Sequence, residues 1–409
     1  MTTLRRRSWV GLELRADGRG LVVEGVDANG PAMDVRTGDR LLAIDGEPVN
    51  GLDQVRRRIA ALPRSRPSAL GLLRDDRELT LELTAQPAPL ETLSRGRIEL
   101  DEAHWRSHRL RLIWSWPAVP PPYRLIWLVP GATWLSEEHF DAPWHPLHKL
   151  VQQLTAGGLA TLRVERSGLG DSEGPACTEL GLDAELQGLL AARARIERRP
   201  ELRAGATLLF GRSLGGMVVA LLQAQVKPAG CAIWGSSARP WPSATLDSTL
   251  QQYRLSGLGA EALERKRVDL EHLHQLVYAR GLTPREAFEA QPQLQHLEQA
   301  GYRGTQIFGR TARFFQQLSR EDVAAAFASS RAPLLSLHGS CDWLSSRTDA
   351  EHIAALCAPH SRFESLAGLD HHVQLRESLE GAYAEPWGGH YSPLLGKALL
   401  RFADDVMGP

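Results

Sequence analysis

Residues 206–220 read ATLLFGRSLGGMVVA, two apolar runs on either side of a glycine-flanked serine. The first run predicts a buried strand, and the second begins a helix. The motif Gly211-x-Ser213-x-Gly215 between them predicts a sharp strand-to-helix turn, in which small neighbours allow a strained serine backbone. Such a turn exposes the Ser213 hydroxyl as a candidate nucleophile and directs the N–H groups of the helix start at an oxyanion. The alternative is a glycine-rich connection without chemistry.

Length and composition limit the number of domains and the class of protein. A chain of 409 residues is long for one compact domain, so two domains are expected. Its apolar content of 43% and charged content of 23% are ordinary for a soluble globular protein. The formal net charge of −1 gives no support to binding of nucleic acid or of an anionic membrane.

The cysteines and the first residues bear on the compartment. The four cysteines form no C-x-x-C pair and have no metal-site spacing. The basic start, residues 1–7, runs on without an apolar signal segment, and no run of 18 apolar residues occurs. We therefore expect a cytoplasmic protein with reduced thiols and no membrane span.

Residues 1–88 predict a small β-rich domain with one amphipathic helix over residues 52–62. Turn signals such as Asp17-Gly18 and Asp45-Gly46 bound its short strands. Those strands are expected at residues 10–14, 20–26, 40–44, 69–73 and 79–83.

This segment resembles a PDZ domain of the bacterial protease-associated type. The resemblance rests on residues 10–14, residues 30–32, the run TGDRLLAIDGEPV at residues 37–49, and the helix after it. It implies that Val10, Gly11 and Leu12 form the loop that receives the C-terminal carboxylate of a peptide, which then adds a strand to the sheet. The alternative is a degenerate PDZ unit that only packs on its neighbour.

Residues 89–99, which follow a proline-rich stretch, are expected to be a linker, and strands and helices alternate over residues 100–409. This alternation predicts an α/β domain with a mostly parallel sheet. Strands are expected at residues 109–116, 123–129, 159–164, 206–210, 231–234, 334–337 and 362–366, with a last helix over 393–406. Residues 237–330 show no strand signal and predict a helical lid, with helix starts at Thr283 and Ser319.

A serine nucleophile needs a base and an orienting acid, each at the carboxyl end of a strand. The strand at residues 334–337 leads into Asp342, and the strand at residues 362–366 leads into His371. Asp342 is therefore the expected acid and His371 the expected base, in the chain order serine, acid, histidine.

The expected oxyanion hole combines two backbone N–H groups. Leu214 directly follows the nucleophile, and Ala132 lies in the loop after the strand at residues 123–129. The glycine-rich turn RSGLGDSEG, residues 166–174, lies at the same edge of the sheet. It matches neither of the glycine motifs that bind phosphates.

Residues 100–409 resemble an α/β-hydrolase. The resemblance rests on Pro130-Gly131, the turn at residues 166–172, Gly211-Arg212-Ser213-Leu214-Gly215-Gly216, His338-Gly339-x-x-Asp342 and Asp370-His371. Many such enzymes have His-Gly where this chain has Pro130-Gly131. With the preceding domain, the chain is similar to bacterial PDZ-containing serine hydrolases, which implies His371 rather than His372 as the base.

The expected function is hydrolysis of an ester, thioester or amide through an acyl-enzyme on Ser213, with a protein or peptide C-terminus recruited at the PDZ domain. A peptidase or acyltransferase acting on a PDZ-bound peptide is one alternative, and a catalytically silent scaffold is another. No cofactor is implied. A metal at His139, His145 and His148 is disfavoured by their spacing. Four tryptophans are expected to pack in the core, with the lining of an apolar pocket as the alternative role: Trp127, Trp134, Trp144 and Trp343.

Overall fold

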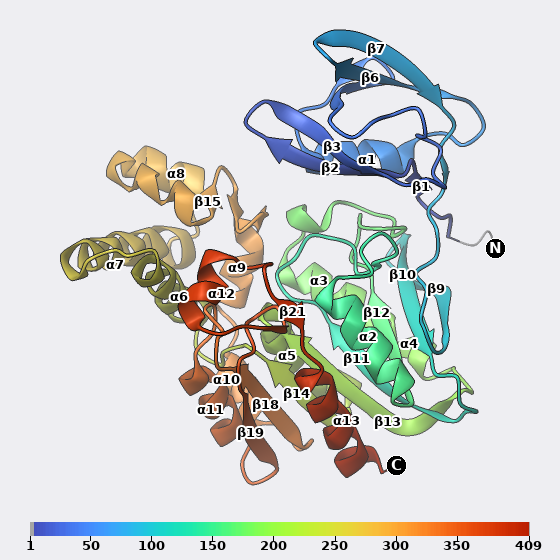
Figure 1. Cartoon of the computed structure of the whole chain (residues 1–409). Coiled ribbons are helices and arrows are strands. Elements are labelled where there is room, and N and C mark those ends of the chain that lie inside the picture. Colours follow the sequence, from blue (N-terminus) through green and yellow to red (C-terminus); the bar gives the residue numbers. More distant parts are fainter. Residues whose placement is uncertain (1–3, 409) are drawn as a thin grey trace. The chain divides into compact units, whose positions relative to one another are not determined.

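A computed structural model describes residues 4–408 of the chain (Figure 1). The chain divides into two compact units, Met1–Leu90 and Glu91–Pro409. Within the described residues, no helix combines the length and the apolarity needed to cross a membrane.

The first unit is an antiparallel sheet with one helix, α1 (Leu52–Ala61). The strand order is β2-β3-β4-β6-β7, so β2 (Leu12–Asp17) is an edge strand. Val55 on α1 is fully buried, and its cluster includes Val23 and Leu70 from the sheet. The other strands are β1 (Ser8–Trp9), β3 (Gly20–Val26), β4 (Arg40–Ile44), β5 (Glu47–Pro48), β6 (Ser68–Arg74), β7 (Arg77–Leu83) and β8 (Gln86–Pro87).

The second unit is built on an eight-stranded sheet of order β19-β18-β14-β13-β11-β12-β10-β9. The six strands from β19 to β12 are parallel, and β10 and β9 join them as an antiparallel edge. Parallel strands direct their carboxyl ends to one edge, where a site can be assembled from several loops. The strands are β9 (Arg97–Trp105), β10 (His108–Trp116), β11 (Tyr123–Val129), β12 (Leu159–Val164), β13 (Leu202–Arg212), β14 (Gly230–Trp234), β18 (Leu334–Gly339) and β19 (Ser361–Leu366).

Helices cover both faces of this sheet (Figure 1). Side chains alternate along β13, so Leu209 joins the core on one face while Leu208 and Phe210 join the core on the other. The first core includes α3 (Leu182–Ala191), α5 (Leu214–Val226) and α11 (Arg347–Leu356). The second includes α2 (Pro146–Ala156) and α13 (Leu394–Met407).

The segment between β14 and β18 is mainly helical. It contains α6 (Trp241–Leu255), α7 (Ala260–His274), η2 (Gln275–Ala279), α8 (Pro284–Ala290), η3 (Pro292–Ala300), α9 (Ala312–Leu318) and α10 (Val323–Ala328). It also holds a small antiparallel sheet that the sequence did not predict, β15 (Tyr302–Arg303), β16 (Gln306–Ile307) and β17 (Arg310–Thr311).

The two helix starts expected in this segment differ in outcome. Thr283 caps α8 in a complete capping box with Glu286, as predicted. The start at Ser319 is wrong, because Ser319 ends α9 and Asp322 caps the next helix by accepting the Ala325 N–H at 2.8 Å. The Asp322 carboxylate, three residues later, therefore forms the N-cap that the sequence pattern had predicted for Ser319.

The residues around the expected linker belong in part to the second unit. Glu91 is buried and pairs with Arg163 on β12 at 2.8 Å and with His148 on α2 at 2.6 Å. Burial raises the pKa of Glu91, but the Arg163 charge and the hydrogen bond to His148 outweigh it and lower the pKa to about 2. β9 begins at Arg97 and forms a hairpin with β10.

Candidate active site

Ser213 lies in a strained turn between β13 and α5. Its φ of 56° is positive, which a non-glycine residue rarely adopts. Its N–H donates to the Trp234 carbonyl at 2.8 Å, which fixes the turn to the end of β14. A Cβ on Gly211 would lie 2.3 Å from the Gly215 carbonyl oxygen, so the motif requires glycine where strand and helix approach.

Asp342 follows β18 and is buried with its acceptors satisfied. Oδ1 accepts the N–H groups of Leu344 at 2.8 Å and Ser345 at 2.9 Å, and Oδ2 accepts the Ser345 hydroxyl at 2.6 Å. Burial would raise the pKa of Asp342, but the charge and the hydrogen bond of His371 outweigh it and lower the pKa to about 2. The carboxylate is therefore ionised at neutral pH.

His371 follows β19 and bonds to this carboxylate. Its Nδ1 lies 2.8 Å from Asp342 Oδ2, and its backbone carbonyl accepts the Trp234 indole N–H at 3.1 Å. Because the carboxylate is ionised, Nδ1 of His371 donates its proton to it, and Nε2 is the ring nitrogen that can exchange a proton with Ser213. The preceding Asp370 shapes the turn by accepting the backbone N–H groups of His372 and Gln374, each at 2.9 Å.

The candidate catalytic residues converge on Trp234 and Gly235 at the end of β14. A Cβ built on Gly235 would lie 2.8 Å from Asp342 Oδ2 and 3.0 Å from His371 Nδ1, so only glycine fits beside this pair. The residue before it, Trp234, bonds to both Ser213 and His371. The fold thus brings the expected nucleophile, acid and base to one strand end.

The expected oxyanion donors also meet at Ser213. A Cβ on Gly131 would lie 3.4 Å from the Ser213 Cβ, so the loop that carries Ala132 passes directly beside the nucleophile. Within the described residues, neither the Ala132 N–H nor the Leu214 N–H donates a hydrogen bond. Both groups are thus open to a ligand oxygen.

Arg166, in the glycine-rich turn after β12, holds this loop in place. Its guanidinium donates to the Thr133 carbonyl at 2.9 Å and also to the Gly131 carbonyl, on either side of Ala132. Its Nε pairs with Glu185 of α3 at 3.1 Å, and the other Glu185 oxygen pairs with Arg310 of β17. Burial opposes ionisation of Glu185, but the two guanidinium groups outweigh it and lower the pKa of that carboxyl. The turn therefore orders the oxyanion loop.

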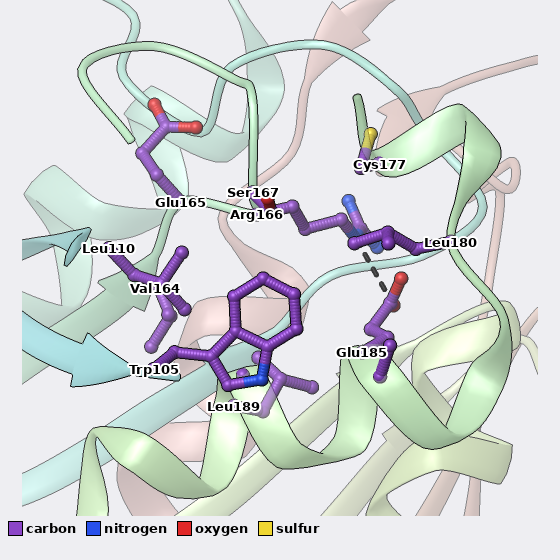
Figure 2. A pocket seen from close by; sticks show the side chains of 12 residues that line it. Trp105, Leu110, Val164, Glu165, Arg166, Ser167, Cys177, Leu180, Glu185 and Leu189 are labelled. Carbon is purple, nitrogen blue, oxygen red and sulfur yellow. Dashed lines mark hydrogen bonds and ion pairs between the residues drawn. The ribbon is translucent and has the colours of Figure 1, made fainter. Parts of the chain in front are cut away.

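A small cavity lies behind this ion pair (Figure 2). Trp105, Leu189 and Cys177 line it together with Arg166 and Glu185. Its volume of about 20 Å³ is room for one water molecule, so it is too small for a substrate.

A larger cavity of about 460 Å³ lies near the base. Trp144 and Trp387 line it with 65% and 55% of their surfaces exposed, and Lys149 supplies a cation. The Trp387 ring stacks on His372, with centroids 4.2 Å apart. Trp144 therefore lines a pocket, whereas Trp127 is a core residue as expected.

The three histidines considered as metal ligands have other partners. His148 bonds to Glu91, while His139 stacks on His145 with ring centroids 4.0 Å apart. Burial lowers the pKa of His145 to about 4 and that of His139 well below its usual range. Over residues 4–408 no group of three or more histidine, cysteine or acidic side chains has a geometry that fits a metal ion.

His372 differs from its neighbour His371. Among residues 4–408 its ring has no acidic hydrogen-bond partner, and its buried Nδ1 has no partner at all. Burial, with the nearby charges of His371 and Arg212, lowers the pKa of His372 to about 3, so it is neutral at physiological pH.

The loop at Val10–Gly11 in the first unit is the one predicted to receive a peptide carboxylate. Gly11 has a φ of 76°, and neither the Val10 nor the Gly11 N–H makes a hydrogen bond within the described residues. Leu12 begins the edge strand β2, where it is partly exposed. Peptide-binding domains of this kind use a strand edge beside N–H groups that have no partner in the domain itself.

Sequence reasoning missed two features of the site. Ser345 bonds to the acid, and Trp387 stacks beside the base, from loops with no strand or helix signal. A third residue, Arg212, was quoted as part of the serine motif but given no role, although a cation next to a nucleophile is itself a signal.

Comparisons with known proteins agree with this architecture. A family model described as serine aminopeptidase, S33, matches residues 144–378, and a PDZ domain model matches residues 8–85. A search of curated proteins gave no match.

Two solved structures illustrate the likeness of fold. DcsB in complex with its substrate analogue is 15% identical, with a TM-score of 0.50 over 76% of this chain and 100% of that chain. Est1E from Butyrivibrio proteoclasticus with bound ferulic acid is 16% identical, with a TM-score of 0.50 over the same shares of the two chains, 76% and 100%. At such identities the likeness concerns the fold alone.

The S33 match covers more than half of the chain and lies on the strands and loops that carry Ser213, Asp342 and His371. The preceding PDZ match covers most of the first unit. The chain therefore belongs to the serine aminopeptidase S33 family of α/β-hydrolases, and it carries a PDZ domain ahead of its hydrolase domain.

Proposed function

We propose that this enzyme cleaves an ester, thioester or amide through an acyl-enzyme on Ser213. His371 Nε2 takes the Ser213 proton as the hydroxyl oxygen attacks the carbonyl carbon, and then gives that proton to the leaving group. Water repeats the sequence to release the acid. The buried Asp342 carboxylate keeps the proton on Nδ1 and stabilises the imidazolium that forms in each step.

The oxyanion of the tetrahedral intermediate would be held by the Ala132 and Leu214 N–H groups. Both are unoccupied in the described chain, and the positive end of α5 adds a favourable field. Because such donors are already in place before the reaction, they require no reorganisation as charge develops.

One observation carries the proposal: the buried Asp342–His371 pair lies at the strand end to which the strained Ser213 turn is bonded. A silent scaffold would not need a strained serine, an ionised buried acid and two open N–H groups together. Peptidase or acyltransferase activity uses the same residues, and the nature of the leaving group or acceptor distinguishes it.

Labelling of the full chain with a fluorophosphonate probe tests the nucleophile. We expect one label on Ser213, no label on Ser213→Ala, and normal labelling of Ser329→Ala, a matched exposed serine at the end of α10. Hydrolysis of 4-nitrophenyl esters of increasing chain length, beside peptides with free ends, then identifies the preferred acyl group. Label on another serine, or none with folded protein, would refute the assignment.

For the first unit, we propose recruitment of a peptide or protein by its C-terminus. The open N–H groups of Val10 and Gly11 would bind the terminal carboxylate, and the edge of β2 would pair with the peptide backbone. Leu12 and Leu14, both partly exposed on this strand, offer apolar contacts to its side chains. Such recruitment would raise the local concentration of a substrate that carries the recognised terminus.

A further inference from the structure

Arg212 is a cation without a partner at the nucleophile. It is the last residue of β13, directly before Ser213, and its side chain is half-buried. Its guanidinium makes no hydrogen bond or ion pair with any described residue, and its nitrogens are absent from the fully buried polar atoms, so solvent reaches them.

Other buried guanidinium groups of this unit are paired. Arg163 bonds to Glu91, and Arg310 bonds to Glu185. A half-buried cation without a counter-charge has lost part of its hydration, and an arriving anion compensates part of that free-energy cost. Burial accordingly lowers the pKa of Arg212, although an arginine remains charged at neutral pH.

Among the described residues, Glu137 is the carboxyl group that acts on the Arg212 charge, and it is a poor counter-charge. Glu137 lies beyond ion-pair distance of it and is shared with Arg166 at 3.7 Å. Burial also raises the pKa of Glu137. The Arg212 guanidinium therefore has no counter-charge of its own among the described residues.

Two neutral imidazoles complete these surroundings. The Arg212 charge acts on both His145 and His372, in addition to their burial. His145 Nδ1 accepts the Leu147 N–H at 3.2 Å, so the neutral ring carries its proton on Nε2 and can donate there. A guanidinium fork can bind a planar oxyanion through two parallel N–H donors.

We propose that Arg212 is a specificity residue that binds a negatively charged oxygen group, a carboxylate or a phosphate, on the substrate of the Ser213 reaction. This inference rests on the proposed hydrolase function and narrows its substrates to anionic esters or amides. An arginine is suited to this role because its planar fork donates two parallel hydrogen bonds.

Matched substrates test the proposal on the full chain. The mono-4-nitrophenyl ester of glutaric acid and 4-nitrophenyl valerate have acyl chains of equal length and differ in the terminal carboxylate. A second pair, 3-carboxyphenyl valerate and phenyl valerate, places the carboxylate on the leaving group. We expect kcat/KM to favour the anionic member of at least one pair by about tenfold or more.

Variants of Arg212 test whether its side chain causes the preference for anionic substrates. Arg212→Met should reduce the ratio of anionic to neutral kcat/KM by about tenfold or more, and Arg212→Lys by less, because it keeps the charge and loses the fork. Arg347→Met, at an exposed arginine on α11, should leave the ratio unchanged. Inhibition of valerate hydrolysis by glutarate or by inorganic phosphate, measured separately, distinguishes the two kinds of anion.

The outcomes separate this inference from the proposed function. If the neutral esters are hydrolysed but neither pair shows a preference, or if the ratio survives in Arg212→Met, the anion site is refuted while the hydrolase stands. If neither neutral nor anionic esters nor the fluorophosphonate react at Ser213, the hydrolase proposal itself fails. Labelling by the fluorophosphonate also reports whether the Arg212 variants keep a folded active site.

Discussion

Arg166 Nε lies 3.1 Å from Glu185 Oε1, and the same guanidinium bonds to the carbonyls on both sides of Ala132. This pair connects α3 to the loop expected to hold the oxyanion. Arg166→Met should therefore lower kcat by about tenfold to a hundredfold with a smaller change in KM. A misaligned N–H donor loses stabilisation of the oxyanion in the transition state, whereas binding of the uncharged substrate carbonyl changes little.

Steady-state kinetics on a 4-nitrophenyl ester checks this expectation. Arg109→Met is the matched control, since Arg109 pairs with Glu173 of the same turn and with Glu102 of β9. A rise in KM alone would mean that Arg166 affects substrate binding rather than the oxyanion.

Ser213→Ala should lower kcat by about a thousandfold or more while the protein stays folded. The reason is that the covalent route is lost, although the oxyanion donors remain. Circular dichroism and thermal unfolding check the fold, and ester hydrolysis measures the loss. Activity within about tenfold of the parent enzyme would show that another residue is the nucleophile.

His371→Ala should lower kcat by at least about a thousandfold, and His372→Ala by about tenfold or less. Only His371 bonds to the ionised Asp342, whereas His372 stacks on Trp387. The two variants form a matched pair at adjacent positions, measured under identical conditions. A larger loss at His372 would reverse their roles.

The sequence predicted some elements with their observed bounds. β3, β4 and β11 coincide with the predicted ranges, because each is a short apolar run closed by turn residues or prolines. β9 was missed because it is polar and pairs only at the sheet edge. The strands β15–β17 have two residues each, too few for any periodic pattern.

The candidate site could be predicted from the strand topology more than from local sequence patterns. Parallel strands end at one edge, so residues after the correct strands were expected to meet, and Asp342 and His371 do bond there. The partner of Arg166 and the isolation of Arg212 depend on where distant side chains point. Tertiary packing sets those side-chain directions, so the spacing of residues in the sequence does not predict them.

Buried histidines should make the hydrolase unit sensitive to acid. The folded pKa values of His145 and His274 are about 4, below the usual 6.5, mainly through burial. Between pH 6.5 and 4 the unfolded chain therefore binds protons that the folded protein rejects, and stability is lost as pH falls. For His274, which is 7% exposed, the full shift is worth up to roughly 3 kcal/mol.

Urea unfolding at several pH values from 7 to 4.5, followed by tryptophan fluorescence, measures this loss. Ten of the eleven tryptophans lie in residues 91–409, so the signal reports mainly on that unit. His274→Gln should flatten the dependence, whereas His352→Gln, at an exposed position on α11, should not. A free energy of unfolding that is constant from pH 7 to 5 would contradict the expectation.

The PDZ loop should distinguish a free peptide C-terminus from an amidated one. Titration of the full chain with fluorescent peptides of the same sequence should give at least about tenfold weaker binding for the amidated form, since the open Val10 and Gly11 N–H groups lose a charged acceptor. Gly11→Val should abolish the preference, because Gly11 has a positive φ and its Cβ would lie 3.0 Å from the Gly30 Cα. Gly18→Ala is the matched control, as a Cβ there meets no atom within 4 Å. Equal binding of both peptide forms would show that this loop does not receive a carboxylate, and the domain would then be a packing unit rather than a recruiting one.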